Sequence, residues 1–350
     1  MEPQNPPFET QVRPPDEAGI AEATRLILAG FPVAVPTETV YGLAADATRP
    51  EAVARIYAAK GRPSFNPLIV HVKDVAEAER LGIFPREARA LADAFWPGAL
   101  TLVVPVRGDS GLAAAVTAGL GTVALRCPAH PAIRRLLAAV GRPLAAPSAN
   151  TSGAISPTRA EHVLASLGGR IALILDGGPT QRGLESTIVA VEESGARLLR
   201  PGPINFDAIE AALSPPWEGG NRGSAEGGRN PDSDRLADAG AHPQPLPSRA
   251  GRIEAPGQLA SHYAPAKPLR LGAGTADSDE WLIGFGALGG DDNLSPTGDL
   301  DEAAARLFDA LHRADSKPPP KIAVAPIPNR GIGLAINDRL RRAAAPRGED

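Results

Sequence analysis

Short apolar runs that alternate with helical patterns constrain the fold of this chain more than any other feature of its sequence. They recur from Asp16 to about Leu213, and this alternation is typical of an α/β domain. They predict strands over Pro32–Pro36, Pro67–Val72, Leu100–Val106, Thr122–Cys127, Ile171–Asp176, Ser186–Val191 and Ala196–Leu199. Most of these runs are too apolar for a clean two-residue alternation, which indicates a sheet that is covered on both faces.

A change in composition at Ser214 marks the end of this first unit. The stretch from Ser214 to Ala250 is crowded with glycine, proline, serine, asparagine and aspartate, so we interpret it as a flexible linker or a surface insertion. A second, smaller α/β unit follows, with strands near Pro268–Leu271, Trp281–Phe285 and Ile322–Ala325 and helices over Asp299–Ala314 and Gly333–Ala344. We therefore expect a first domain at 16–213, a linker at 214–266 and a second domain at 267–344.

Composition excludes several classes of protein. A formal net charge of -4 leaves no bulk attraction to nucleic acid or to acidic membranes. A single cysteine, Cys127, excludes an internal disulfide framework and a cysteine-based zinc site. The first residues contain no apolar segment of the secretory type, and no apolar run approaches the roughly 20 residues that a membrane span needs. We expect a cytoplasmic protein without a membrane partner.

Familiar catalytic signatures are also missing from the sequence. No lysine follows a glycine, which excludes the lysine-containing phosphate loop, and neither HExxH nor GxSxG occurs. Gly284, Gly286 and Gly289 match GxGxxG, but the turn-like residues after them lack the helix start that would hold a pyrophosphate. We interpret these glycines as part of a loop.

Two cations are expected at the end of a helix in the first domain. Thr48 and Glu51 have the spacing of a capping box, and Gly61 is a suitable stop residue. Lys60 then lies on the last turn and Arg62 just beyond it. By themselves these cations are typical of a solvated helix end.

Other polar residues also interrupt apolar or turn-forming contexts. Arg126 and Arg200 lie at strand ends, and with Lys60 and Arg62 they could form a local cationic pocket for a polyphosphate. His71 interrupts an apolar strand, where a lone histidine is more often a hydrogen-bonded core residue than a catalyst.

Five segments, in this order, carry a resemblance to a known family: PTETVYGL, KGRPSFNPLIVHV, PSANTSG, LESTIV and RPG. Together they resemble the threonylcarbamoyl-AMP synthases that have a YrdC-like catalytic domain. HYAP at His262–Pro265 and the closing IGLAINDRLRRAA resemble the longer, two-domain members. The resemblance implies an open twisted mixed sheet around a basic cavity, followed by a small Rossmann-like α/β domain.

The resemblance also implies a role for individual residues. L-threonine or its carbamate would be held by Thr39, His71, Arg126, the backbone around Ala146, and Ser186. ATP would be held by Arg62, Asn66, Thr122, Ser148, Ser156, Arg200 and Tyr263. The residues associated with activity would be Lys60 and Arg62 of a KxR pair, and Ser148 and Asn150 of an SxN pair. No dedicated metal site is implied, and Mg²⁺ is expected only with the phosphates of ATP.

The implied activity is the joining of L-threonine, bicarbonate and ATP into threonylcarbamoyl-AMP, with release of pyrophosphate. A tRNA threonylcarbamoyl-transferase would receive the product, and no stable complex with nucleic acid is expected. One alternative is a module of the same fold that binds double-stranded RNA, against which stands the lack of a basic stripe. A second is a carbamoyltransferase of the hydrogenase-maturation type, whose cysteine-rich zinc fingers a single cysteine cannot form.

Overall fold

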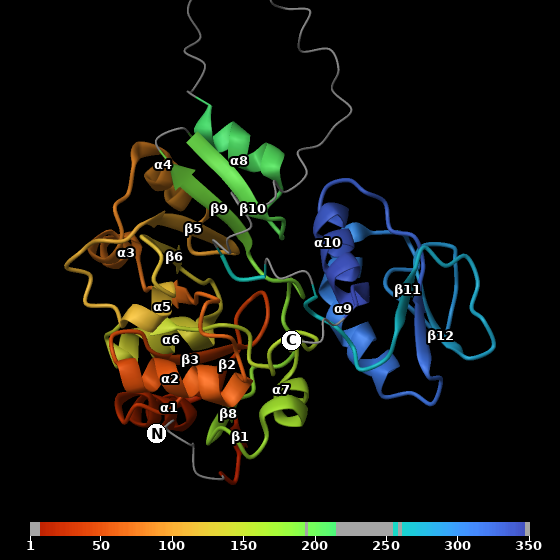
Figure 1. The fold of residues 1–350 in the computed structure, drawn as a ribbon, viewed down its shortest axis with the longest axis horizontal. Helices are drawn as coiled ribbons and strands as arrows, with labels where there is room; N and C mark the ends of the chain where they lie inside the picture. Colours follow the sequence, from red (N-terminus) through yellow and green to blue (C-terminus); the bar gives the residue numbers. More distant parts are fainter. Residues whose placement is uncertain (1–7, 193–194, 215–254, 258–260, 347–350) are drawn as a thin grey trace, which may run out of the picture.

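The computed structural model describes residues 8–192, 195–214, 255–257 and 261–346. Two bodies are seen, each built around its own sheet (Figure 1). The interpretation of Ser214–Ala250 as a linker or insertion falls, apart from Ser214, outside the described residues.

A mixed sheet of ten strands forms the first body. Its spatial order is β1-β8-β2-β3-β7-β4-β6-β5-β9-β10, with both parallel and antiparallel pairs. The strands are β1 (Gln11–Arg13), β2 (Val33–Val35), β3 (Gly42–Asp46), β4 (Ile69–His71), β5 (Leu100–Pro105), β6 (Thr122–Arg126), β7 (Leu144–Ala145), β8 (Leu173–Leu175), β9 (Thr187–Glu192) and β10 (Gly195–Arg200). Each predicted strand overlaps one of them, and the predicted mixed α/β sheet is confirmed.

Three strands escaped prediction from the sequence. β3 reads GLAAD, and alanine and glycine have low strand propensity. β7 has two residues, and all three residues of β1 are exposed. Their place in the sheet comes from pairing with distant strands, as when β1 pairs with β8.

Helices cover both faces of this sheet at β2, as the apolar runs predicted. Val33 and Val35 pack with α1 and α6, whereas Ala34 packs with α2 on the other face. The helices of the first body are α1 (Glu17–Leu28), α2 (Pro50–Lys60), α3 (Val75–Leu81), α4 (Arg86–Phe95), α5 (Ala114–Thr117), α6 (Pro131–Val140), α7 (Ala160–Leu167) and α8 (Phe206–Leu213).

The expected capping box at the start of α2 is wrong. Thr48 donates through its hydroxyl to Asp46 at 2.6 Å, and the N-cap residue is Arg49, which makes no capping hydrogen bond through its side chain. Pro50 lacks an N–H, so one of the donors that a cap would satisfy is missing from the first turn. The C-terminal stop is confirmed, because Gly61 adopts φ 59° in the left-handed region that glycine favours.

The second body is a parallel sheet with two helices. Its order is β11-β14-β12-β13, from β11 (Leu269–Leu271), β12 (Glu280–Gly284), β13 (Asp292–Asn293) and β14 (Lys321–Val324). The helices α9 (Leu300–Asp315) and α10 (Gly333–Ala344) agree with prediction, and only the two-residue β13 was missed. Gly286 lies in a turn that follows β12, so the interpretation of the glycine motif as a loop is confirmed.

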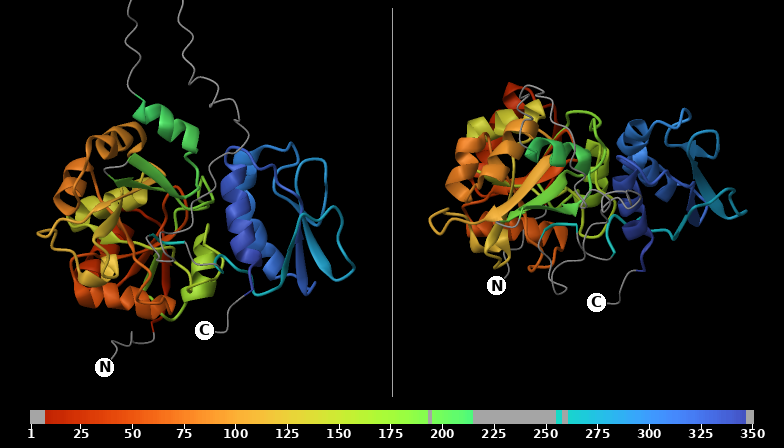
Figure 2. Two further views of the ribbon diagram at one scale, coloured as in Figure 1. Left: turned by 45° about the horizontal axis from the view of Figure 1, so that its top comes forward. Right: turned by 90° about the horizontal axis from the view of Figure 1, so that it is seen from above.

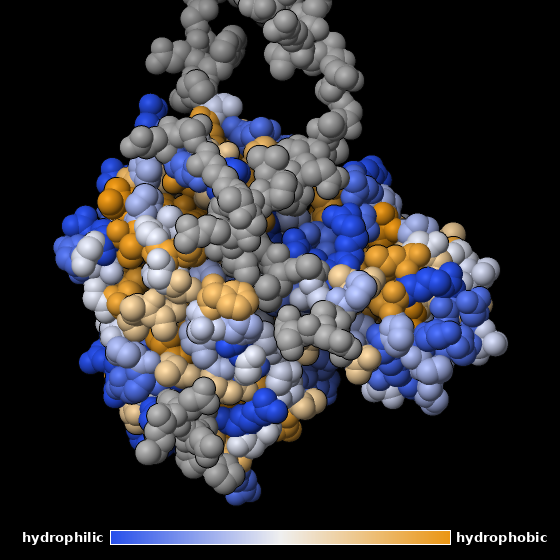
Figure 3. Space-filling model, viewed as in Figure 1, coloured by the Kyte–Doolittle hydropathy of each residue, from blue (hydrophilic) through white to orange (hydrophobic). Residues whose placement is uncertain are grey.

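The two helices of the second body face the first body (Figures 1 and 2). Asp309 of α9 accepts from Arg159 at 2.9 Å, and Arg339 of α10 donates to Glu185 at 2.8 Å. The visible surface of both bodies mixes hydrophilic and hydrophobic residues (Figure 3). Polar contacts therefore join the two bodies beside the segment that connects them.

Candidate active site

A cavity lies on the face of β4 and β6 that is opposite the buried side chains of Val70 and Leu125. Ile69, His71 and Arg126 point into it from these two strands, as the two-residue period of a strand requires. Its lining residues are Thr37, Thr39, Val40, Gly42, Arg62, Ile69, His71, Arg126, Ala146, Pro147, Ser148, Glu185, Ser186, Arg200, Pro256, Gly257, His262 and Tyr263. Most of the residues expected to bind substrate therefore meet in one place.

The cavity is closed on one side by the segment between the two bodies. Tyr263 is 1% exposed, and its ring lies 5.6 Å from that of Phe308 in α9. The next residue, Ala264, donates through its backbone N–H to the carbonyl of Gly153 at 2.8 Å. The cavity volume is about 50 Å³, whereas pockets that hold small molecules usually measure about 300–1,000 Å³. The cavity is thus narrow in this conformation, with residues of this segment in its wall.

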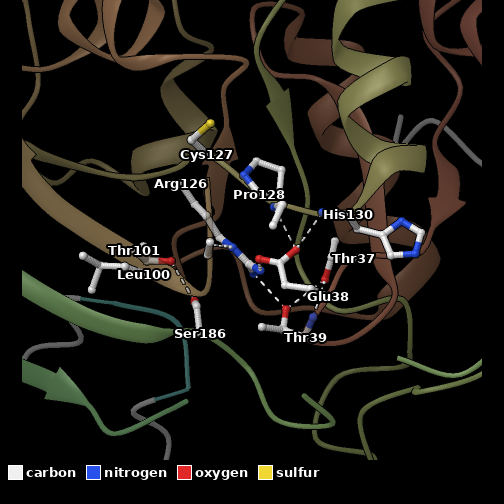
Figure 4. A network of polar contacts seen from close by, with 12 residues as sticks. Thr37, Glu38, Thr39, Leu100, Thr101, Arg126, Cys127, Pro128, His130 and Ser186 are labelled. Carbon is white, nitrogen blue, oxygen red and sulfur yellow. Dashed lines mark hydrogen bonds and ion pairs between the residues drawn. The ribbon is translucent and has the colours of Figure 1, made fainter. Parts of the chain in front are cut away.

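Arg126 is held by three acceptors at one end of the cavity (Figure 4). Its guanidinium donates to Glu38 at 2.6 Å, to the hydroxyl of Thr39 at 2.9 Å and to the carbonyl of Gly98 at 3.2 Å. Burial alone would raise the pKa of Glu38, but the charge and hydrogen bond of Arg126 outweigh it and hold that pKa below its usual value. The result is a buried ion pair beside the cavity.

His71 is fully enclosed next to this pair. Among the described residues, neither ring nitrogen makes a hydrogen bond of good geometry, although the backbone of Ile69 lies near enough to favour the protonated ring slightly. Burial, and then the charge of Arg126, lowers the pKa of His71 to about 3. A neutral imidazole that faces a cavity with both nitrogens unpaired is well suited to bind a polar ligand.

Ser186 lies in the wall of the cavity, between Thr101 and Arg200. Its hydroxyl is 2.7 Å from that of Thr101 and accepts from Arg200 at 3.2 Å. Arg200 also donates to the carbonyl of Ser186 at 3.0 Å and to that of Pro256 at 3.3 Å. Arg200 therefore contacts both the sheet and the segment that covers the cavity.

Lys60 and Arg62 are more enclosed than the sequence suggested. By themselves they were typical of a solvated helix end, but Lys60 is 2% exposed and its ammonium donates to the carbonyls of Ser148, at 2.6 Å, and Asn150. Arg62 donates to the side chain of Asn66 at 2.6 Å. Burial lowers the pKa of Lys60 and takes that of Arg62 to about 10. The solvated helix end is excluded in this conformation, because Lys60 braces the loop that carries Ser148.

Five expected residues lie outside the lining of the cavity. Lys60, Asn66 and Asn150 stand one contact behind it, through the bonds just described. Ser156 donates to Glu185, which does line the cavity. Thr122 is not brought to the cavity: it begins β6 and shares a sheet face with Arg126, about 13 Å further along at the usual rise of a strand.

The sequence did not predict the roles of Glu185 and Arg339, because these residues make their contact between the two bodies. Glu185 accepts from Ser156 and from Arg339 of α10, and Arg339 is fully buried with its guanidinium 5.3 Å from the ring of Tyr263. Both lie within quoted motifs, LESTIV and IGLAINDRLRRAA. The motif order placed them in the chain, but nothing in the sequence indicated that they would pair.

The described residues show neither a metal-binding cluster nor a helix that could span a membrane. In the described parts of the chain, no group of three or more His, Cys, Asp and Glu side chains is arranged to hold a metal ion. None of the described helices combines the length and apolarity needed to cross a membrane.

Models of two protein families match the chain. The model described as "Telomere recombination" matches residues 25–202, and the model described as "Threonylcarbamoyl-AMP synthase, C-terminal domain" matches residues 205–345. The first match lies within the first body, and the second includes all of the second body together with α8 of the first.

Relatives match over nearly the full length of the chain. The threonylcarbamoyl-AMP synthase of Bacillus subtilis is 41% identical and is aligned over 94% of this chain and 93% of its own length. That of Pyrococcus abyssi is 36% identical, over 95% and 96% respectively. The crystal structure of P. abyssi Sua5 complexed with L-threonine superposes with a TM-score of 0.78 at 35% identity, covering 96% of this chain and 97% of that one. With its cationic cavity, its two bodies and these full-length matches, the chain belongs to the threonylcarbamoyl-AMP synthase family of enzymes.

Proposed function

We propose that this enzyme joins L-threonine, bicarbonate and ATP into threonylcarbamoyl-AMP and pyrophosphate, which makes it a nucleotidyltransferase. Family membership over the whole chain is the observation that carries the proposal. The cavity supports it, because it combines a polar end at Arg126 and His71 with a cationic end at Arg62 and Arg200. The same membership favours the synthase over a module for double-stranded RNA.

The polar end is the proposed site for the amino acid. Arg126 would take its carboxylate, and Thr39 and Ser186 would contact its hydroxyl. His71 would bind through an unpaired ring nitrogen, and the backbone and methyl group of Ala146 would contact the side chain. The P. abyssi relative was crystallised with L-threonine, and these residues are the expected counterparts of a threonine site in this chain.

The cationic end is the proposed site for ATP. Arg62 and Arg200 line it, Lys60 and Asn66 stand behind it, and the remaining proposed contacts are Thr122, Ser148, Asn150, Ser156 and Tyr263. Mg²⁺ is proposed as part of the substrate, held by the phosphates, since Mg²⁺ usually binds through substrate oxygens and few carboxylates. Fixed cations near the α-phosphorus would stabilise the charge that develops during transfer.

The proposed chemistry needs no nucleophile from the protein. The amine of threonine attacks CO₂ derived from bicarbonate, loses a proton and becomes a carbamate. A carbamate oxygen then forms a bond to the α-phosphorus of ATP, and the bond from this phosphorus to the bridging oxygen of pyrophosphate breaks. Holding the two reactants in line can remove about 7–11 kcal/mol of the barrier. Closure of the segment around Tyr263 would exclude water, which hydrolyses an acyl-adenylate.

The product is a reactive intermediate, so a second enzyme must consume it. We propose a tRNA threonylcarbamoyl-transferase in the cytoplasm, which makes this enzyme the first step of a tRNA modification. No stable complex with the tRNA is required for that role.

Pyrophosphate release tests the proposed function. ATP is supplied with L-threonine alone, with bicarbonate alone and with both, in buffer depleted of CO₂. Release that needs both, together with threonylcarbamoyl-AMP detected by mass spectrometry, is expected. Release that ignores either substrate would overturn the assignment.

A further inference from the structure

The cations around the cavity fall into two sets. Arg126 forms an ion pair with Glu38, with 2.6 Å between the nearest nitrogen and oxygen. Lys60, Arg62 and Arg200 instead donate to carbonyl, amide and hydroxyl oxygens, and no described carboxylate lies within ion-pair distance of them. The charge at the Arg126 end is therefore balanced, while the charge at the other end is left for an anionic ligand.

We propose that Glu38 is a positioning residue for the amino-acid substrate, which orients the guanidinium of Arg126 and balances its charge so that the subsite accepts a zwitterion. This inference rests on the proposed function, because it assumes an amino acid at this end of the cavity. Glu38 does not line the cavity and acts only through Arg126.

Two N–H donors of Arg126 are not taken by the described residues, and a carboxylate can use two donors at once. A guanidinium has five N–H donors. Glu38, Thr39 and Gly98 take one each, from Nη2, Nη1 and Nε respectively. One N–H is left on each terminal nitrogen, and two such donors can bind the two oxygens of a carboxylate together. Without Glu38, Nη2 loses its fixed acceptor and the guanidinium can turn away.

Glu38 is itself held in place from behind (Figure 4). Its second carboxylate oxygen accepts from the backbone N–H groups of Ala129 at 3.0 Å and His130 at 3.2 Å, directly before α6. Its own backbone carbonyl accepts from the N–H of Arg182 at 2.8 Å. The carboxylate is therefore fixed by the start of a helix, and it transmits this rigidity to Arg126.

Charge balance also separates the two ligands. A buried unpaired arginine attracts any anion, including the phosphates of ATP and pyrophosphate. Pairing with Glu38 leaves this end close to neutral, beside a neutral His71, and so matches an amino acid that carries both charges. Loss of Glu38 should therefore weaken threonine binding and allow pyrophosphate to compete for the same place.

The test compares L-threonine binding in wild-type protein, Glu38→Gln and Glu38→Asp. Calorimetric titration is expected to show a dissociation constant at least about tenfold higher in Glu38→Gln. The KM for ATP should change by no more than about twofold, because the phosphate end is untouched. Inhibition by pyrophosphate should become competitive with threonine. L-threonine methyl ester, which lacks the carboxylate charge, should bind wild type and Glu38→Gln alike.

The control is Glu79→Gln, which removes the same charge from a surface ion pair with Arg89 at 2.6 Å. It should leave threonine binding unchanged. Thermal unfolding shows whether each variant is folded. If Glu38→Gln is not folded, Glu38→Asp takes its place in the test, because it keeps the charge but moves the carboxylate back by one methylene. Folded Glu38 variants that bind threonine like wild type would overturn the proposal, as would equal losses for threonine and its ester. Binding is measured without turnover, so a wild type that binds threonine but releases no pyrophosphate would remove the proposed function and leave this inference standing.

Discussion

Two parts of the site are held together by different interactions. We call the residues of the first body that line the cavity, with Lys60 behind them, the floor, and we call the segment around Tyr263 with the helices α9 and α10 the cover. On the floor, Lys60 and Arg200 donate to backbone carbonyls, which carry no net charge. In the cover, Arg339 of the second body pairs with the carboxylates of Glu185 and Asp338. Lys60 and Arg200 thus keep their charge for a ligand, whereas the charge of Arg339 is balanced by carboxylates, and its pair with Glu185 joins the two bodies. From this difference we predict that the reaction takes place among the residues of the first body and that the second body serves to cover them.

Breaking the cover should have the largest effect on stability. Arg339→Met leaves Glu185 buried without its partner, and removing one member of a buried ion pair typically costs about 3–5 kcal/mol. The free energy of unfolding, from denaturant titration, measures the loss. Arg341→Met on the same helix is the matched control, since Arg341 is exposed. If both variants were equally stable, Arg339 would not fasten the two bodies.

Substrate selectivity tests the floor at its polar end. Serine lacks the methyl group of threonine, and a pocket for one methyl can discriminate by about 10–200-fold. Thr39, Ser186 and Ala146 are all buried there, so the specificity constant kcat/KM for threonine should exceed that for serine within this range. Equal constants for the two amino acids would mean that the side chain of the substrate does not contact these three residues.

The cationic end of the floor should carry a smaller effect that is seen in turnover. Lys60→Ala or Arg62→Ala should reduce the rate at least tenfold, on the order of 1.4 kcal/mol of transition-state stabilisation. Because Lys60 also braces two carbonyls, Lys60→Ala should lower stability as well, and Lys60→Met separates the charge from the packing of the stem. Steady-state rates of pyrophosphate release measure the effect, with the exposed Lys73→Ala as control. A wild-type rate in folded Lys60→Met would mean that its charge serves structure alone.

The sequence predicted more of the floor than of the cover, and the reason is physical. The sequence predicted the strand that ends near Arg126 and the stop of α2 at Gly61 beside Lys60, because both depend on local geometry. The burial of Lys60 could not be predicted, since it depends on carbonyls of Ser148 and Asn150 from a distant loop. Glu185 and Arg339 pair across two bodies, and β3 is a strand only because β2 and β7 flank it. Local patterns indicate elements, whereas such contacts arise from the assembled fold.

The pH dependence of stability tests a second contact between the two bodies. His162 of α7 stacks on His312 of α9 with ring centroids 3.8 Å apart, and Asp309, Arg159 and Arg313 surround the pair. Burial, and then His312, lowers the pKa of His162 to about 3. In the unfolded chain His162 takes up a proton below about pH 6.5 while in the folded protein it stays neutral, so its contribution to stability is present above pH 6.5 and is lost as pH falls.

For His162 this loss should amount to about 1 kcal/mol between pH 7.5 and pH 5.5. Unfolding titrations at both pH values, on wild type and His162→Gln, measure it. The variant should show the flatter dependence. A dependence as steep as that of wild type would assign the effect to other histidines.

The smallest expected effect is a change in hydrogen exchange as the cover moves. It compares the cover directly with the floor. Tyr263 has φ 64°, a backbone conformation that a tyrosine rarely adopts, and closure over a ligand is one arrangement that would hold it there. We predict that the segment 255–267, whose described residues Pro256, Gly257, His262 and Tyr263 line the cavity, opens for ATP to bind and closes again before the reaction. Its backbone amides should therefore exchange hydrogen modestly more slowly with ATP and L-threonine bound than in the free protein, while those of β4 and β6 should hardly change. Hydrogen exchange followed by mass spectrometry resolves the two regions in one experiment.

Tyr263→Ala should weaken the ligand-dependent protection and lower activity, because the ring is part of the seal against water. Unchanged protection on binding, combined with full activity of Tyr263→Ala, would reduce this segment to a passive connection, and the cover would then play no part in the chemistry of the floor.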